Sequence, residues 1–120
     1  MTIAQRIEEL RLITDGWFGG YGKPPSRPDL GRLEWRFQSW PDDVPQPNLF
    51  PAKNKRISAE WVLGDWSIDL EIDFSGEEMT GNYNALNITT LSECDKRLDL
   101  LSFTEWQWLV DEIRRLAVIR

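Results

Sequence analysis

Two neighbouring stretches, Ile57-Ser58-Ala59-Glu60-Trp61-Val62-Leu63 and Trp66-Ser67-Ile68-Asp69-Leu70-Glu71-Ile72-Asp73-Phe74, alternate apolar and polar residues almost without a break. Alternation with a period of two is typical of β-strands that bury one face and expose the other. Gly64-Asp65 separates the two stretches, and this dipeptide favours a tight hairpin turn. The sequence therefore predicts an antiparallel hairpin at the centre of the fold.

Further strands are expected on both sides of this hairpin. Asn48–Phe50 is a short candidate, and Pro51 restricts it to an edge or to a strand end. Thr80–Thr89 predicts a third long strand, and Arg97–Leu100 predicts a short final one. Together these segments predict an antiparallel meander of three to five strands.

The N-terminal part of the chain predicts two helices. Thr2 is the expected N-cap of the first, which has its apolar residues on one helical face. The second begins at Ser26 or Asp29 and keeps its apolar face as far as Trp40. Pro41 then stops it, because the residue before a proline is disfavoured in the α conformation.

The C-terminal part predicts one more helix. Ser102 and Glu105 have the spacing of a capping box, and a regular apolar stripe follows them. Residues 1–120 are therefore expected to form a single α+β domain, in which the helices cover one face of the sheet. The other face would be exposed to solvent.

The charge is unevenly distributed along the chain. The 120 residues carry a net charge of -6, but residues 57–95 contain nine carboxylates and no Lys or Arg. This segment therefore has a local charge of -9, against +2 before it and +1 after it. A surface of one sign attracts cations or basic partners and repels nucleic acid.

The predicted strands would bring several of these acids together. Asp69, Glu71 and Asp73 emerge on one side of a single strand, about 7 Å apart. Glu60 lies on the polar side of the neighbouring strand, and Asp65 lies in the turn between the two. The spacing along the strand is close to the phosphate repeat of a nucleic-acid strand, so these residues are candidate contacts for a basic protein surface.

The alternative interpretation is an ordinary solvated sheet face. In that case, arginines of the helices would neutralise part of the negative charge. The candidates for this role are Arg6, Arg11, Arg32 and Arg36.

A second group of candidate contacts lies in the segment 16–25, which is rich in glycine, proline and aromatic residues. Trp17 and Tyr21 are the candidate hot spots, because aromatic residues often anchor interfaces. The alternative is that this segment covers one end of the core.

Catalytic chemistry has little support in the sequence. The chain contains no histidine, and Cys94 is its only cysteine, so general-base and thiol catalysis lack their usual partners. We expect no catalytic residue, no cofactor and no dedicated metal site, because carboxylates on a flat strand diverge. The N-terminus lacks a secretory pattern and no stretch is long enough to span a membrane, so we expect a cytoplasmic protein.

One pattern resembles a known group of sequences. It consists of Trp40-Pro41-Asp42-Asp43-Val44-Pro45-Gln46-Pro47, Ile57 through Glu60-Trp61, Gly64-Asp65-Trp66 and Leu70-Glu71-Ile72. The pattern covers about 40–87 and resembles small bacterial and phage proteins to which we attach no activity. The resemblance implies a bacterial or phage origin and the central hairpin, and it implies no catalytic residue.

These observations favour a non-enzymatic protein-binding module. It would dock a basic, nucleic-acid-handling protein as an inhibitor, antitoxin or immunity protein does, including inhibitors of the anti-CRISPR kind. One alternative is a structural subunit of a homo- or hetero-oligomer. The other is a small enzyme or ligand-binding domain that works through carboxylates. The sequence leaves the oligomeric state open.

Overall fold

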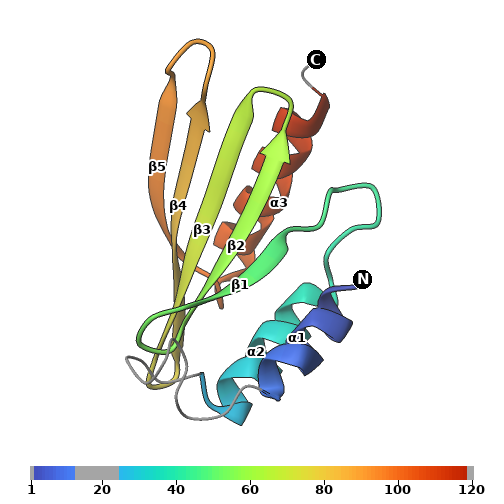
Figure 1. Cartoon of the computed structure of the whole chain (residues 1–120), viewed down its shortest axis with the longest axis vertical. Helices are drawn as coiled ribbons and strands as arrows, with labels where there is room; N and C mark the ends of the chain where they lie inside the picture. Colours follow the sequence, from blue (N-terminus) through green and yellow to red (C-terminus); the bar gives the residue numbers. More distant parts are fainter. Residues whose placement is uncertain (1, 13–24, 119–120) are drawn as a thin grey trace.

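The computed structural model describes residues 2–12 and 25–118 and contains three helices and one five-stranded sheet within them. The strands are antiparallel and follow one another in the order β1-β2-β3-β4-β5 (Figure 1). The predicted α+β meander is therefore confirmed. The elements are α1 (Ile3–Arg11), α2 (Arg27–Phe37), β1 (Asn48–Ala52), β2 (Arg56–Leu63), β3 (Trp66–Ser75), β4 (Glu78–Asn87), β5 (Glu93–Asp99) and α3 (Phe103–Val118).

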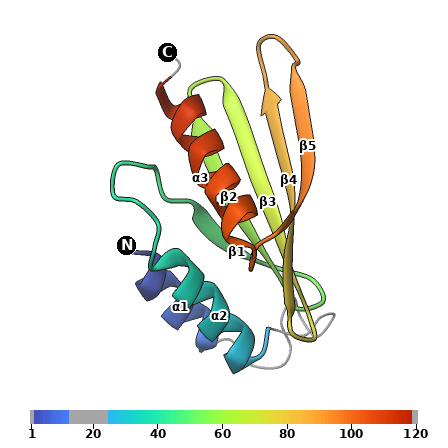
Figure 2. The same cartoon turned by 180° about the vertical axis from the view of Figure 1, so that it is seen from behind.

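The helices are arranged less uniformly than the sequence predicted. α3 lies across one face of the sheet, whereas α1 and α2 pack side by side at the end of the molecule near β1 (Figures 1 and 2). We call the face covered by α3 the inner face and the opposite one the outer face. The expectation that the helices cover one sheet face is thus confirmed only in part.

The alternating pattern sets which side chains point inward. Ile57, Ala59 and Trp61 of β2 are buried, and so are the even-numbered residues of β3 from Ile68 to Phe74. The central hairpin turns at Gly64, whose φ of 60° favours glycine. On β4, Gly81 faces inward, and a Cβ there would lie 2.5 Å from Cδ1 of Leu70. The missing side chain of Gly81 leaves room for that leucine.

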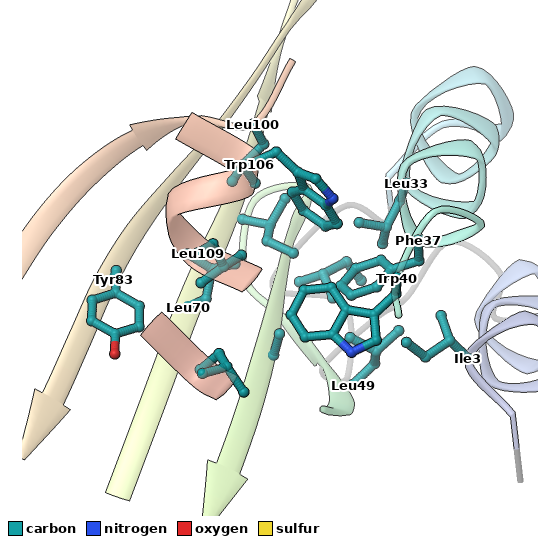
Figure 3. Close-up of a cluster of buried hydrophobic side chains, with 14 of the residues drawn as sticks. Ile3, Leu33, Phe37, Trp40, Leu49, Leu70, Tyr83, Leu100, Trp106 and Leu109 are labelled. Carbon is teal, nitrogen blue, oxygen red and sulfur yellow. The ribbon is translucent and has the colours of Figure 1, made fainter. Parts of the chain in front are cut away.

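Four aromatic residues join the helices to the inner face. Trp40 packs against Phe37 and Trp106, with ring centroids 5.5 and 5.6 Å away (Figure 3). It also stacks on Trp61, whose ring centroid lies 5.9 Å away. The indole N–H of Trp40 donates to the carbonyl of Val44, and that of Trp61 donates to the carbonyl of Pro45. The proline-containing segment after α2 is therefore fastened to the core by two indoles.

The end of α2 differs from the prediction. The helix ends at Phe37 instead of continuing to Trp40. The amide of Trp40 bonds the carbonyl of Phe37 in a tight turn, which directs its indole into the core. The cause is Pro41, which disfavours helical backbone at the residue before it and so ends the helix before that residue.

β5 is also longer than predicted, because it begins at Glu93 rather than at Arg97. Its residues are exposed apart from Leu98, so it carries no alternating apolar pattern. β4 spans Glu78–Asn87 instead of Thr80–Thr89.

Candidate functional site

The outer face brings the predicted carboxylates together in rows that cross the sheet. Glu60 on β2 lies opposite Asp69 on β3, which lies opposite Asn84 on β4. Asn84 in turn lies opposite Asp95 on β5. Neighbouring strands are about 5 Å apart, so this row places three carboxylates within a short distance. We call the following six residues the acidic face: Glu60, Asp69, Glu71, Asp73, Glu93 and Asp95.

One end of the acidic face is neutralised within the sheet. The guanidinium group of Arg56 lies 3.1 Å from the Glu71 carboxylate and 3.5 Å from that of Asp73. Arg56 is opposite Asp73 in the register, one residue before the segment that lacks cations. Glu60, Asp69 and Asp95 have no such partner among the described residues, where no ion pair of theirs is found.

The helix arginines, which the alternative interpretation named as candidate neutralisers, do not form ion pairs with the acidic face. Their hydrogen bonds join the helices to one another, to backbone carbonyls or to nearby acids. The partners are Leu49 and Glu9 for Arg6, Glu8 and Glu34 for Arg11, Asp29 and Gly76 for Arg32, and Leu100 and Ser102 for Arg36. Among the residues that the structure describes, only Arg56, a residue of the sheet itself, offsets part of the charge through an ion pair.

Asp69 lies at the centre of the unneutralised part. Partial burial of its carboxylate raises its pKa, and the negative charges of Glu60, Glu71 and Asp95 raise it further. A raised pKa means that the ionised form is disfavoured in the folded protein. The fold therefore holds this carboxylate in a place where a nearby cation would stabilise it.

Asn84 organises the β5 side of the acidic face. Its side-chain amide donates to Asp95 at 2.5 Å and to Glu93 at 2.9 Å. None of these three residues was predicted as a contact, because the predicted final strand begins only at Arg97 and leaves out the first half of β5. The signal that would have found them is the pairing of Asn84 with Asp95, which requires the β4–β5 register.

The other predicted contacts lie apart from the acidic face. Asp65 lies in the turn between β2 and β3, and its backbone carbonyl accepts from Ile88. It is exposed at the end of the sheet rather than within the rows. Trp17 and Tyr21 lie outside the described residues.

Apolar side chains lie beside the acidic row. Val62 is next to Glu60 on the same face of β2 and is 79% exposed. In the register, its row continues through Ser67 to Leu86, which is half-buried. At the other edge, Phe50 of β1 is 43% exposed. The outer face thus combines charge with apolar surface.

Several clefts lie away from the acidic face. One of about 440 Å³ lies between α2 and α3, and its walls include Trp35, Arg36 and Phe103 but no carboxylate. A smaller one of about 180 Å³ is lined by Trp108, Asp111, Glu112 and Arg115. Within the described residues, no group of three or more His, Cys, Asp or Glu side chains is arranged to hold a metal ion.

The chain was compared with known proteins at three levels. No protein-family model, no curated protein and no solved structure matches it. Within residues 2–12 and 25–118, no helix is long and apolar enough to cross a membrane.

Proposed function

We propose that this protein is a non-enzymatic binding module that docks a basic protein surface on its acidic face. The observation that carries the proposal is the row Glu60–Asp69–Asp95, which crosses the sheet without a cation among the described residues to pair with it. An inhibitor, antitoxin or immunity protein of a nucleic-acid-handling enzyme would use such a surface. The proposal includes a cytoplasmic location.

The charges support this function because the carboxylates near Asp69 repel one another, and a cation of a partner would offset that repulsion. Partial burial and the neighbouring negative charges raise the pKa of Asp69 and so disfavour its ionised form. A lysine or arginine placed over the row would interact with several carboxylates at once. Complementary charge of this kind raises the association rate and fixes the register of a complex.

The geometry supports a basic surface that normally binds nucleic acid. Carboxylates repeat about every 7 Å along β3, which is comparable with the separation of successive phosphates in one strand. The rows also continue across the sheet, so the acidic face offers a two-dimensional array of negative groups. Such an array fits a channel lined with Lys and Arg better than it fits a single cation.

Apolar contacts would supply affinity beyond the charges. Val62 and Leu86 adjoin the acidic row, and exposed apolar residues beside charged ones are typical of an interface. Because charge gives specificity and rate more than affinity, these side chains are the expected source of tight binding.

The test measures the binding of poly-L-lysine, a simple basic probe, by isothermal titration calorimetry. The double variant Glu60→Lys/Asp69→Lys reverses the centre of the acidic face. We expect its affinity to fall at least about tenfold, which corresponds to roughly 1.4 kcal/mol. The affinity of the unmodified protein should also fall as salt rises, because the charges are exposed to solvent.

The matched control is Glu8→Lys/Asp42→Lys, which changes the net charge equally at two exposed positions outside the sheet. This variant should bind poly-L-lysine much more tightly than Glu60→Lys/Asp69→Lys does. Equal losses in the two double variants would show that net charge alone attracts the probe, and the docking face would then be rejected.

A further inference from the structure

The two edges of the sheet differ in how their backbone groups are used. Hydrogen bonds of an antiparallel strand point alternately to one side and to the other. An edge strand therefore directs every second residue's N–H and C=O away from the sheet, where another strand can pair with them. β1 and β5 are the two edge strands of this sheet.

The β1 edge is closed. The carbonyl of Leu49 points away from β2 and accepts a hydrogen bond of 2.8 Å from Nε of Arg6. Pro51 follows Leu49 by two residues, so its backbone nitrogen, which carries no hydrogen, also faces away from β2. A proline at that place removes the donor that an added strand would need.

The β5 edge is open over a short stretch. The amide of Asn87 donates to the carbonyl of Ser92, and the amide of Leu100 donates to that of Met79. With the β4–β5 register, these bonds show that the even-numbered residues of β5 bond to β4. Lys96 therefore bonds towards β4, while Glu93, Asp95 and Arg97 direct their backbone groups away from the sheet.

The open stretch ends at Asp99. The amide of Asp99 donates to the carboxylate of Glu105, and its carbonyl accepts from the amide of Ser102. Within the described residues, no hydrogen bond engages the backbone N–H or C=O groups of Glu93, Asp95 or Arg97. The pairing edge therefore runs from Glu93 to Arg97.

Lys96 does not block this edge. It is the charged residue on the inner side of the open stretch, and such residues commonly protect edge strands. Its ammonium group lies 4.4 Å from the ring centroid of Trp108 on α3. The Lys96 side chain therefore folds back over α3.

We propose that the β5 edge pairs with an extended, basic segment of the partner. This inference rests on the proposed function: the partner would attach by adding a strand next to β5. The segment would carry Lys or Arg at alternate positions, because its outer side chains would lie beside Glu93, Asp95 and Asp99, which outnumber the single cation Arg97 on that face of β5. Its other side chains would be apolar, because they would lie on the inner side next to Cys94.

Charge favours such a segment over a second copy of this chain. A copy pairing antiparallel about Lys96 would set Asp95 opposite Arg97, which is attractive, but it would also set Glu93 opposite Asp99 and Lys96 opposite its own equivalent. Like charges directly opposite each other destabilise a strand pair. The copy would also bring a second net charge of -6 to the same edge. A basic segment brings no second negative charge to the edge, and on the outer side of β5 it meets a like charge only at Arg97.

The test uses a peptide of alternating lysine and valine as the probe and two variants at one position. Arg97→Pro removes an outward N–H and places a ring at the edge, whereas Arg97→Gln keeps the N–H. Both variants lose the same positive charge, so attraction by charge alone would strengthen binding equally. We expect Arg97→Gln to bind at least as tightly as the unmodified protein and Arg97→Pro to bind about tenfold or more weakly.

A second measurement does not depend on the folding of a variant. In the unmodified protein, amide hydrogen exchange at Asp95 and Arg97 should slow when the peptide is added. Exchange at Lys96, which already bonds β4, should change little. Equal binding by the two Arg97 variants, no new protection at Asp95 and Arg97, or no binding of the peptide would overturn the edge proposal.

The two proposals fail separately. If Glu60→Lys/Asp69→Lys abolishes peptide binding while Arg97→Pro retains it, the acidic face stands and the edge proposal is wrong. If Arg97→Pro loses binding while the double reversal retains it, the edge is a binding site and the acidic face is not.

Discussion

The inner and outer faces of the sheet are formed by the same five strands but are built from opposite chemistry. The inner face buries Trp61, Leu70 and their neighbours beneath the helices. The outer face carries carboxylates of which only Glu71 and Asp73 form an ion pair within the described part of the chain. Because alternate residues point to opposite faces, each strand contributes to stability on one side and to surface charge on the other. Substitutions on the two faces should therefore change different properties.

The largest expected effect is on the inner side, at Trp40. This side chain is 6% exposed, stacks on Trp61 and contacts Trp106 edge-on. Trp40→Ala should lower the free energy of unfolding by about 3–5 kcal/mol, because it removes a large buried ring and leaves a cavity. Chemical denaturation followed by circular dichroism measures the change.

The matched control for this prediction is Trp35→Ala. Trp35 is 56% exposed on α2, so Trp35→Ala should lower the free energy of unfolding by much less than Trp40→Ala does. Similar losses at both positions would show that burial does not distinguish the two indoles.

The next effect concerns a buried cation, Arg36. Its Nε donates to the carbonyl of Leu100 at 2.8 Å, and its Nη2 donates to that of Ser102 at 3.0 Å. The guanidinium group also lies over the rings of Trp35 and Trp106. Burial lowers its pKa, but an arginine remains protonated throughout the physiological range. Arg36 thus ties α2 to the start of α3.

Arg36→Met keeps most of the packing volume but leaves two carbonyls without their donors. We expect the free energy of unfolding to fall by about 1–3 kcal/mol, measured by the same denaturation experiment. Arg27→Met, an exposed change on the same helix, is the control and should have little effect. If the two variants are equally stable, the hydrogen bonds of Arg36 do not support the inner side.

The difference between buried and exposed strand faces also explains which strands could be predicted from the sequence. The central hairpin was predictable because burial of one face imposes alternation on β2 and β3. Of β5, only the part from Arg97 was predicted, because Glu93-Cys94-Asp95-Lys96-Arg97 is charged on both sides and is held by pairing with β4. Burial leaves no periodic signal on an exposed edge strand.

The candidate site was predictable to the same extent. The Gly64-Asp65 turn fixes the register of the hairpin, so Glu60 beside Asp69 follows from the sequence. The same register places Arg56 opposite Asp73, and this neutralising pair could have been found from it. Asp95 could not, because the loop between β4 and β5 does not reveal how those strands align.

The smallest expected effect lies on the outer face, and its sign is opposite to that of the others. The pKa of Asp69 is raised by partial burial and by Glu60, Glu71 and Asp95, so its ionisation destabilises the folded protein. Asp69→Asn should therefore raise the free energy of unfolding at neutral pH, by up to about 0.5 kcal/mol because solvent screens these charges.

The pH dependence identifies the cause of that gain. Between the ordinary pKa of an aspartate and the raised value in the folded protein, the folded state binds more protons than the unfolded state. The unmodified protein therefore recovers stability at this residue as the pH falls through that window, and the advantage of Asp69→Asn should disappear in acid. Asp73→Asn, which removes a carboxylate 3.5 Å from Nε of Arg56, should give no such gain. Thermal unfolding of the three proteins at neutral and acidic pH compares the two ends of the acidic face. If Asp73→Asn raises the stability at neutral pH as much as Asp69→Asn does, Arg56 leaves both ends equally unneutralised.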